Sequence, residues 1–100
     1  MYIDKLPEKN VRQLFNAILS LKTKEECSAF FDDLCTPNEI KAFVQRLEVA
    51  RMLNEGQTYM DIQIETGAST ATITRVKKLL EFGNNGYRLV FDRIQDTRKV

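Results

Sequence analysis

The stretch from Thr66 to Arg75 reads TGASTATITR, a run of short hydroxyl- and methyl-bearing side chains that ends in an arginine. β-Branched residues and serine are mediocre helix formers, yet the next residues, VKKLLEF, continue a helical pattern. Short side chains of this kind can donate or accept a hydrogen bond, or touch a thymine methyl, at the edge of a base pair. The composition therefore indicates non-covalent recognition, for which some helix propensity has been given up.

Residues that could carry covalent or metal chemistry are few and poorly spaced. The chain has no histidine, the commonest general base. Cys27 and Cys35 are eight residues apart, which fits neither a CxxC redox pair nor a zinc site, and we interpret both as buried, reduced thiols. Asp32 and Asp33 are neighbours, and neighbours in a helix point apart. The sequence therefore predicts neither an enzyme nor a metal site, and it calls for no cofactor.

Length and composition bound the class of protein. The 100 residues suffice for one compact domain, residues 1–100, but not for two. The net charge of +1 argues against a generally basic nucleic-acid coat protein. No segment resembles a signal peptide or approaches the roughly 20 apolar residues of a membrane span. We expect a cytoplasmic protein that does not enter a membrane.

Apolar residues recur at helical spacing along the chain, which predicts an all-α fold of about six helices. Capping boxes, each a threonine with an acidic residue three positions later, mark helix starts at Thr23, Thr36 and Thr58. The last residues, Thr97–Val100, are expected to fray. The apolar anchors expected for successive helices are Val11, Leu14, Phe15, Ile18 and Leu19; Cys27, Phe30, Phe31 and Leu34; Ile40, Phe43, Val44, Leu47 and Ala50; Tyr59, Ile62 and Ile64; and Tyr87, Val90, Phe91 and Ile94.

The third of these helices carries a second apolar set, Val49, Met52 and Leu53, outside its main stripe. A helix that is apolar on two sides must be buried on two sides, which a monomer of this size can rarely provide. We infer that this helix packs against a second copy of the chain. The alternative is that Met52 and Leu53 only cover the neighbouring helices of the same chain.

Residues 58–80 fit a helix-turn-helix. Such a motif needs an apolar residue in its first helix, a glycine with positive φ in the turn, and a buried aliphatic stripe on its second helix. These positions are filled by Ile62, Gly67, Ile73, Val76 and Leu80. Gln63 departs from the pattern, because many such motifs have alanine there for close contact between the helices.

The second helix would then be a recognition helix in a major groove about 12 Å wide. We expect Thr70, Ala71 and Thr74 at base edges, and Arg75 at phosphates or at a guanine edge. The alternative is a buried helix–helix interface made of small residues. All residues predicted to contact DNA are Gln63, Ser69, Thr70, Ala71, Thr74, Arg75, Lys77 and Lys78.

Two segments, LCTPNEIKAFVQRLEVARMLNEG and TGASTATITR, resemble the Trp repressor superfamily, in particular its small YerC/YecD branch. The resemblance extends from Leu34 to about Leu80. It implies an intertwined, all-helical homodimer whose two recognition helices enter successive major grooves of double-stranded DNA, the docking geometry of which Trp repressor is itself a standard example.

In that superfamily a tryptophan corepressor lies between two arginines. The resemblance carries these onto Arg46 and Arg75, with Thr72 in the same pocket. A glycine and a serine of the superfamily's pocket correspond to Val76 and Leu79 here, and overpacking such a site costs about 1–3 kcal/mol. We therefore expect that free tryptophan is not the effector, and the residues identify no other small molecule.

Two functions from different classes fit these residues. The leading hypothesis is a homodimeric, sequence-specific DNA-binding transcriptional regulator that represses by occluding its operator. The other is a helical protein-protein interaction module that keeps the fold and binds a protein through exposed Phe, Met and Tyr side chains. A basic stripe of Arg75, Lys77 and Lys78 favours the first, whereas the near-neutral net charge favours the second.

Overall fold

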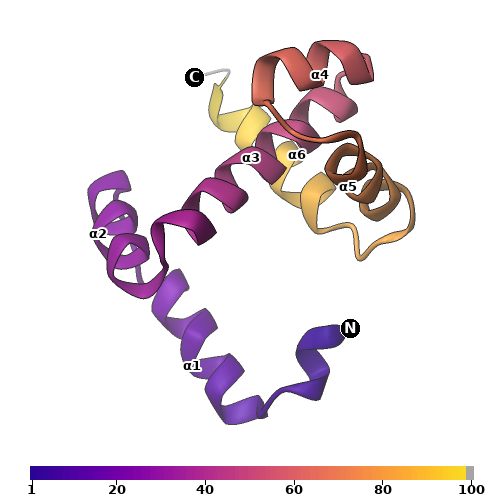
Figure 1. Cartoon of the computed structure of the whole chain (residues 1–100). Coiled ribbons are helices and arrows are strands. Elements are labelled where there is room, and N and C mark those ends of the chain that lie inside the picture. The colour runs from indigo at the N-terminus through magenta and orange to yellow at the C-terminus, as the bar shows by residue number, and fades with distance from the viewer. Residues whose placement is uncertain (99–100) are drawn as a thin grey trace. The chain divides into compact units, whose positions relative to one another are not determined.

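A computed structural model gives the structure of the chain. Every regular element among its described residues is a helix, which confirms the all-α prediction. The structure describes the backbone of residues 1–98 and the side chains of residues 1–94. A short 3₁₀ helix that the sequence did not predict comes first (Figure 1). In chain order the elements are η1 (Tyr2–Lys5), α1 (Glu8–Leu19), α2 (Lys24–Leu34), α3 (Pro37–Asn54), α4 (Tyr59–Thr66), α5 (Thr70–Phe82) and α6 (Gly86–Arg98).

The helix starts follow the capping chemistry that the sequence predicts. At the start of α3 the box is complete: the Thr36 amide donates to Glu39 Oε1 at 2.8 Å, and the Glu39 amide donates to Thr36 Oγ1 at 3.2 Å. The backbone amide of Thr36, and to a smaller extent its hydroxyl, hold the pKa of the Glu39 carboxyl below its ordinary value. At the start of α2 the Glu26 amide donates to Thr23 Oγ1, as a capping box requires. The Glu26 carboxylate, however, accepts from the amide of Lys22, the residue before Thr23, instead of from that of Thr23 itself.

The chain forms two compact units, Met1–Ile40 and Lys41–Val100. In the first unit, none of the described residues of η1, α1 and α2 is buried. The apolar stripe expected on α1 is present, but Leu14, Phe15 and Leu19 are 39%, 43% and 82% exposed. Both cysteines are free; Cys27 is exposed and Cys35 half-buried. The prediction that both thiols are buried was wrong, because α2, which contains Cys27 and ends just before Cys35, buries no side chain.

The second unit contains the hydrophobic core. In Figure 1, α4, α5 and α6 lie around the C-terminal half of α3. The buried apolar residues come from all four helices and from the turn between α4 and α5. Leu53, Tyr59 and Tyr87 pack against this core from its edge. Its buried members are Val49, Ala50, Met52, Ile62, Ala68, Ile73, Val76, Leu80 and Phe91.

Helix α3 buries its second apolar set within its own chain, together with Ala50 from the end of the main stripe. Val49 and Met52 lie in the core with α4 and α5, whereas Phe43, Val44 and Leu47 of the main stripe are exposed. Val49 and Met52 therefore cover the neighbouring helices of the same chain, and packing of α3 against a second copy stays a prediction. The sequence offered two apolar faces without showing which one the neighbouring helices would cover.

Ile64 and the end of α6 also differ from the sequence prediction. Ile64 is not an anchor of α4, since it is 77% exposed while Ile62 is fully buried. Helix α6 includes Thr97 and Arg98, which were expected in a frayed end, and residues 99 and 100 lie outside the described residues. Within α6 Phe91 is buried and stacks on Tyr87, with ring centroids 6.1 Å apart.

Candidate nucleic-acid interface

The helix-turn-helix consists of α4, a three-residue turn and α5. Gly67 ends α4 in the left-handed conformation with φ of +69°, as the sequence predicted. Gln45 of α3 donates its side-chain amide to the carbonyl oxygen of Thr66 at 3.1 Å. This hydrogen bond links the last residue of α4 to α3. It thereby fixes the turn and the position at which α5 packs on the core.

Helix α5 presents two opposite faces. Ile73, Val76 and Leu80 are buried in the core. The side chains at i, i+3, i+4 and i+7 on the other face are exposed, and these are Ala71, Thr74, Arg75 and Lys78. This outer stripe combines small side chains near the helix N-terminus with two cations further along. The prediction of a buried interface of small residues does not fit this exposure.

Ser69 has a structural task at the start of α5. Its hydroxyl oxygen accepts the backbone amide of Thr72 at 3.2 Å and lies 3.2 Å from Thr72 Oγ1. This is an N-cap, which satisfies an amide that the helix itself leaves unpaired. Thr70, one residue later, is exposed on the first turn. Of the hydroxyls predicted to contact DNA at this end, that of Ser69 is already engaged by the chain.

Gln63 and Lys77 lie outside the outer stripe. Gln63 is exposed on α4, and its backbone carbonyl accepts the amide of Gly67 at 2.9 Å. The Lys77 ammonium lies 5.9 Å from the ring centroid of Tyr59. The Tyr59 hydroxyl in turn lies 3.4 Å from Thr74 Oγ1. The sequence predicts Tyr59 only as an apolar anchor, because its contact with Thr74 joins residues fifteen positions apart.

The cations of α5 differ from the arginine on α3. Arg51 forms ion pairs with Glu48 at 2.6 Å and with Glu55 at 2.8 Å, and its hydrogen bonds with Glu48 are the main cause of the raised pKa of its guanidinium group. Among the described residues, no ion pair involves Arg75, Lys77 or Lys78. The basic side chains of α5 therefore keep their charge available for an external anion such as a phosphate.

The residues assigned to an effector pocket have other neighbours within the chain. The Arg46 guanidinium lies over the ring of Phe43, 5.7 Å from its centroid. Thr72 is half-buried beside Ser69, and Arg75 is exposed on the outer stripe. Val76 points into the core, and Leu79 is 44% exposed. Leu79 borders a hollow whose other lining residues are Leu47, Gly83, Asn84, Gly86, Tyr87 and Val90.

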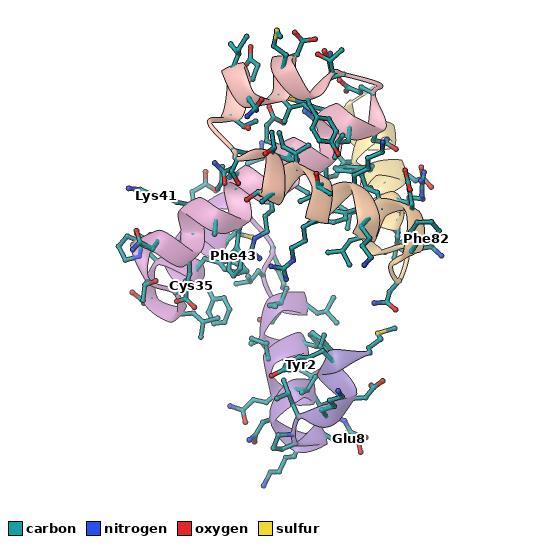
Figure 2. All side chains as sticks on the ribbon, turned by 45° about the vertical axis from the view of Figure 1, so that its right-hand side comes forward. Tyr2, Glu8, Cys35, Lys41, Phe43 and Phe82 are labelled. Atoms are coloured by element: carbon teal, nitrogen blue, oxygen red, sulfur yellow. The ribbon has the colours of Figure 1, made fainter. Side chains whose placement is uncertain are left out.

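Exposed apolar side chains also occur on this unit. Met60 and Ile64 lie one turn apart on α4 and are 70% and 77% exposed. Phe82, which Figure 2 shows at the end of α5 beside the loop to α6, is also exposed. None of the described helices is both long and apolar enough to cross a membrane.

Fold and site together define an all-helical helix-turn-helix protein with a small and basic outer face on its second helix. A family model described as Trp repressor protein matches residues 9–95. The chain therefore belongs to the Trp repressor protein family, as its sequence resemblance indicated. That family is one of DNA-binding regulators rather than of enzymes.

Known relatives cover almost the entire chain. The uncharacterised protein YerC of Bacillus subtilis (strain 168) is 63% identical over 97 residues, which is 97% of this chain and 93% of YerC. A crystal structure of a candidate Trp repressor from Staphylococcus aureus is similar with a TM-score of 0.91 and 53% identity, over 95% of each chain. A TrpR-like protein from Eubacterium eligens ATCC 27750 gives a TM-score of 0.89 and 55% identity, over 92% of this chain and 95% of that one. The YerC-like assignment is thereby confirmed.

Proposed function

We propose that the protein is a cytoplasmic, homodimeric transcriptional regulator that binds double-stranded DNA in a sequence-specific manner and represses by occluding its operator. The observation that carries the proposal is the outer stripe of α5, with Ala71 and Thr74 followed by Arg75 and Lys78 on the face opposite the core. Small side chains allow the helix to approach base edges, and the cations reach phosphates. Membership of the Trp repressor protein family supports the same function.

The roles of individual side chains follow from their places on α5. We assign Thr70, Ala71 and Thr74 to base edges, because they are short and lie on the first turns of the helix. Arg75, Lys77 and Lys78 are assigned to phosphates, with Arg75 also within reach of a guanine edge. Gln63 and Ser69 complete the interface from α4 and from the cap of α5. Because few cations contribute, we expect modest affinity and a shallow dependence on salt.

The DNA-binding proposal is tested by fluorescence anisotropy with a labelled, random-sequence duplex. Arg75→Ala and Lys78→Ala should each weaken binding to all sequences. The slope of log K against log salt should become shallower by about 0.9 for each phosphate that the variant leaves unneutralised. Thr74→Ala should leave this non-specific affinity nearly unchanged. Lys24→Ala, which removes a cation at the start of α2, serves as the charge-matched control. Equal affinities for all the variants would contradict docking through α5.

We propose that a second copy of the chain covers the exposed apolar side chains of α2 and α3. Val44 is 65% exposed on α3, and Leu34 is 52% exposed on α2. Monomers rarely leave so many large apolar side chains in water without a partner. Val44→Asp should therefore convert the protein from a dimer to a monomer in sedimentation velocity. A monomeric wild-type protein at micromolar concentration would contradict the homodimer.

Tryptophan is proposed not to be an effector. Arg46, one of the two residues expected to enclose the indole, already stacks on the chain's own Phe43. Leu79 takes the place of a serine at the edge of the hollow beside α6, which removes a hydroxyl partner for a ligand's amino group. Isothermal titration with free tryptophan should give no heat of binding, and a micromolar dissociation constant would contradict this part of the proposal.

A protein-interaction module is the second candidate function. The exposed pair Met60 and Ile64 on α4 favours it, because two large apolar side chains one turn apart can anchor a partner helix. The two functions make opposite predictions for Met60→Glu with Ile64→Glu. In this double variant an interaction module would lose its protein partner and would show negligible DNA affinity before and after the change, whereas a DNA-binding regulator would keep its affinity for a specific operator.

A further inference from the structure

We propose that Tyr59 is a positioning residue for DNA recognition, which holds Thr74 and Lys77 of the recognition helix in place from the neighbouring helix α4. The inference rests on the proposed DNA-binding function and extends it. It depends on two contacts from one side chain: the Tyr59 hydroxyl lies 3.4 Å from Thr74 Oγ1, and the Tyr59 ring lies 5.9 Å from the Lys77 ammonium nitrogen.

Tyr59 is well fixed for this role. It is the first residue of α4, directly after Thr58, whose hydroxyl oxygen accepts the amide of Asp61 at 3.2 Å. Its ring is half-buried and packs against the edge of the core. The backbone and the ring are therefore both held before any DNA binds. A tyrosine has only two side-chain torsions, so little freedom remains for its hydroxyl.

The contact with Thr74 bears on sequence preference. Cβ of threonine carries one hydroxyl and one methyl group, so holding the hydroxyl also fixes the direction of the methyl. The oxygen–oxygen distance of 3.4 Å is at the outer limit of a hydrogen bond. A Thr74 fixed in one rotamer would present a single pattern of donor, acceptor and methyl to a base edge.

The contact with Lys77 bears on charge. A lysine ammonium within about 6 Å of an aromatic centroid is attracted by the negative face of the ring. Lys77 lies three residues after Thr74 on α5, so both are on the side of the helix that adjoins α4. The Tyr59 ring thus draws the Lys77 ammonium toward the side of α5 that adjoins α4. The Tyr59 hydroxyl orients Thr74 on the same side.

The test is selection of bound duplexes from a random-sequence DNA pool, with preference determined at each base-pair position. The proteins are the wild type, Tyr59→Phe, Thr74→Ala and the double variant. Tyr59→Phe keeps the ring and its contact with Lys77 but removes the hydroxyl. We expect it to reduce discrimination about three- to tenfold at the same base pair that Thr74→Ala affects. In the Thr74→Ala background the same change should have no further effect, which a purely structural role would not predict.

Tyr87→Phe is the matched control, because it removes a phenol hydroxyl from a ring that also packs against this core but belongs to α6. It should leave the preference profile unchanged. An unaltered profile for Tyr59→Phe, with an altered one for Thr74→Ala, would overturn the inference alone. A wild-type protein that selects no sequence would overturn the proposed function itself, and the inference with it.

Discussion

The helix-turn-helix unit and the N-terminal unit use similar apolar content in different ways. In the former, Ile62, Ile73 and Val76 are almost completely buried against α3 within one chain. In the latter, the described residues of α1 and α2 form amphipathic helices that bury nothing, and Leu19 is 82% exposed. The difference indicates that the helix-turn-helix unit holds its shape through its own core, whereas the N-terminal helices leave their apolar stripes exposed.

The largest expected effect tests whether the helix-turn-helix unit is held by its own core. Ile73→Ala removes a fully buried side chain and should lower the free energy of unfolding by about 2–5 kcal/mol. Urea denaturation measures this decrease. Ile64→Ala is the matched control, since it removes the same atoms from an exposed site and should change stability by no more than about 0.5 kcal/mol. Equal decreases for the two variants would remove the basis for the comparison between the units.

A second, smaller effect concerns the turn that aims α5. Gly67 has φ of +69°, and a Cβ at this position would meet open space, so Gly67→Ala carries a conformational cost alone. We expect stability to fall by about 1–2 kcal/mol because of the left-handed backbone. Gly86→Ala, at the start of α6, also meets open space but has no positive φ, and it should be nearly neutral. Thermal unfolding of both variants provides the measurement.

The smallest expected effect concerns the N-terminal unit, whose helices have solvent-exposed N-caps and bury none of their described residues. The lowered pKa of the Glu39 carboxyl means that the folded state favours its charged form. Glu39 therefore contributes stability above the ordinary glutamate pKa of about 4.3, and loses it as the pH falls through the lowered value. The Glu39→Gln variant should have a lower free energy of unfolding than the wild type near neutral pH. This difference in the free energy of unfolding should shrink in acid. A difference that grows in acid would contradict this sign.

Much of the architecture could be predicted from local patterns. The helical spacing, the caps at Thr23, Thr36 and Thr58, and the positive φ of Gly67 depend on neighbours within a few residues, and the structure has them as expected. The side of α3 that faces the core could not be predicted, because both sides are apolar and the choice depends on how α4 and α5 pack. The exposure of Cys27 was missed for a similar reason, since periodicity reveals a stripe but not what covers it.

The candidate site divides in the same way. That Thr74 and Lys78 share an outer face follows from helical geometry, and the structure agrees. The N-cap role of Ser69 could have been predicted from the sequence, because serine directly before a helix is a common N-cap. The contacts of Tyr59 with Thr74 and Lys77, and of Gln45 with Thr66, join separate helices and required the fold. Specific recognition by the assigned side chains remains a prediction.

The most direct test of the central claim is selection of bound duplexes by the purified wild-type protein from a random pool, at moderate salt and without added ligand. We predict recovery of a two-fold symmetric site whose half-sites are spaced by about one helical turn, roughly 34 Å, because two α5 helices would enter successive major grooves. Recovery of no preferred sequence by a folded, dimeric protein would contradict the claim.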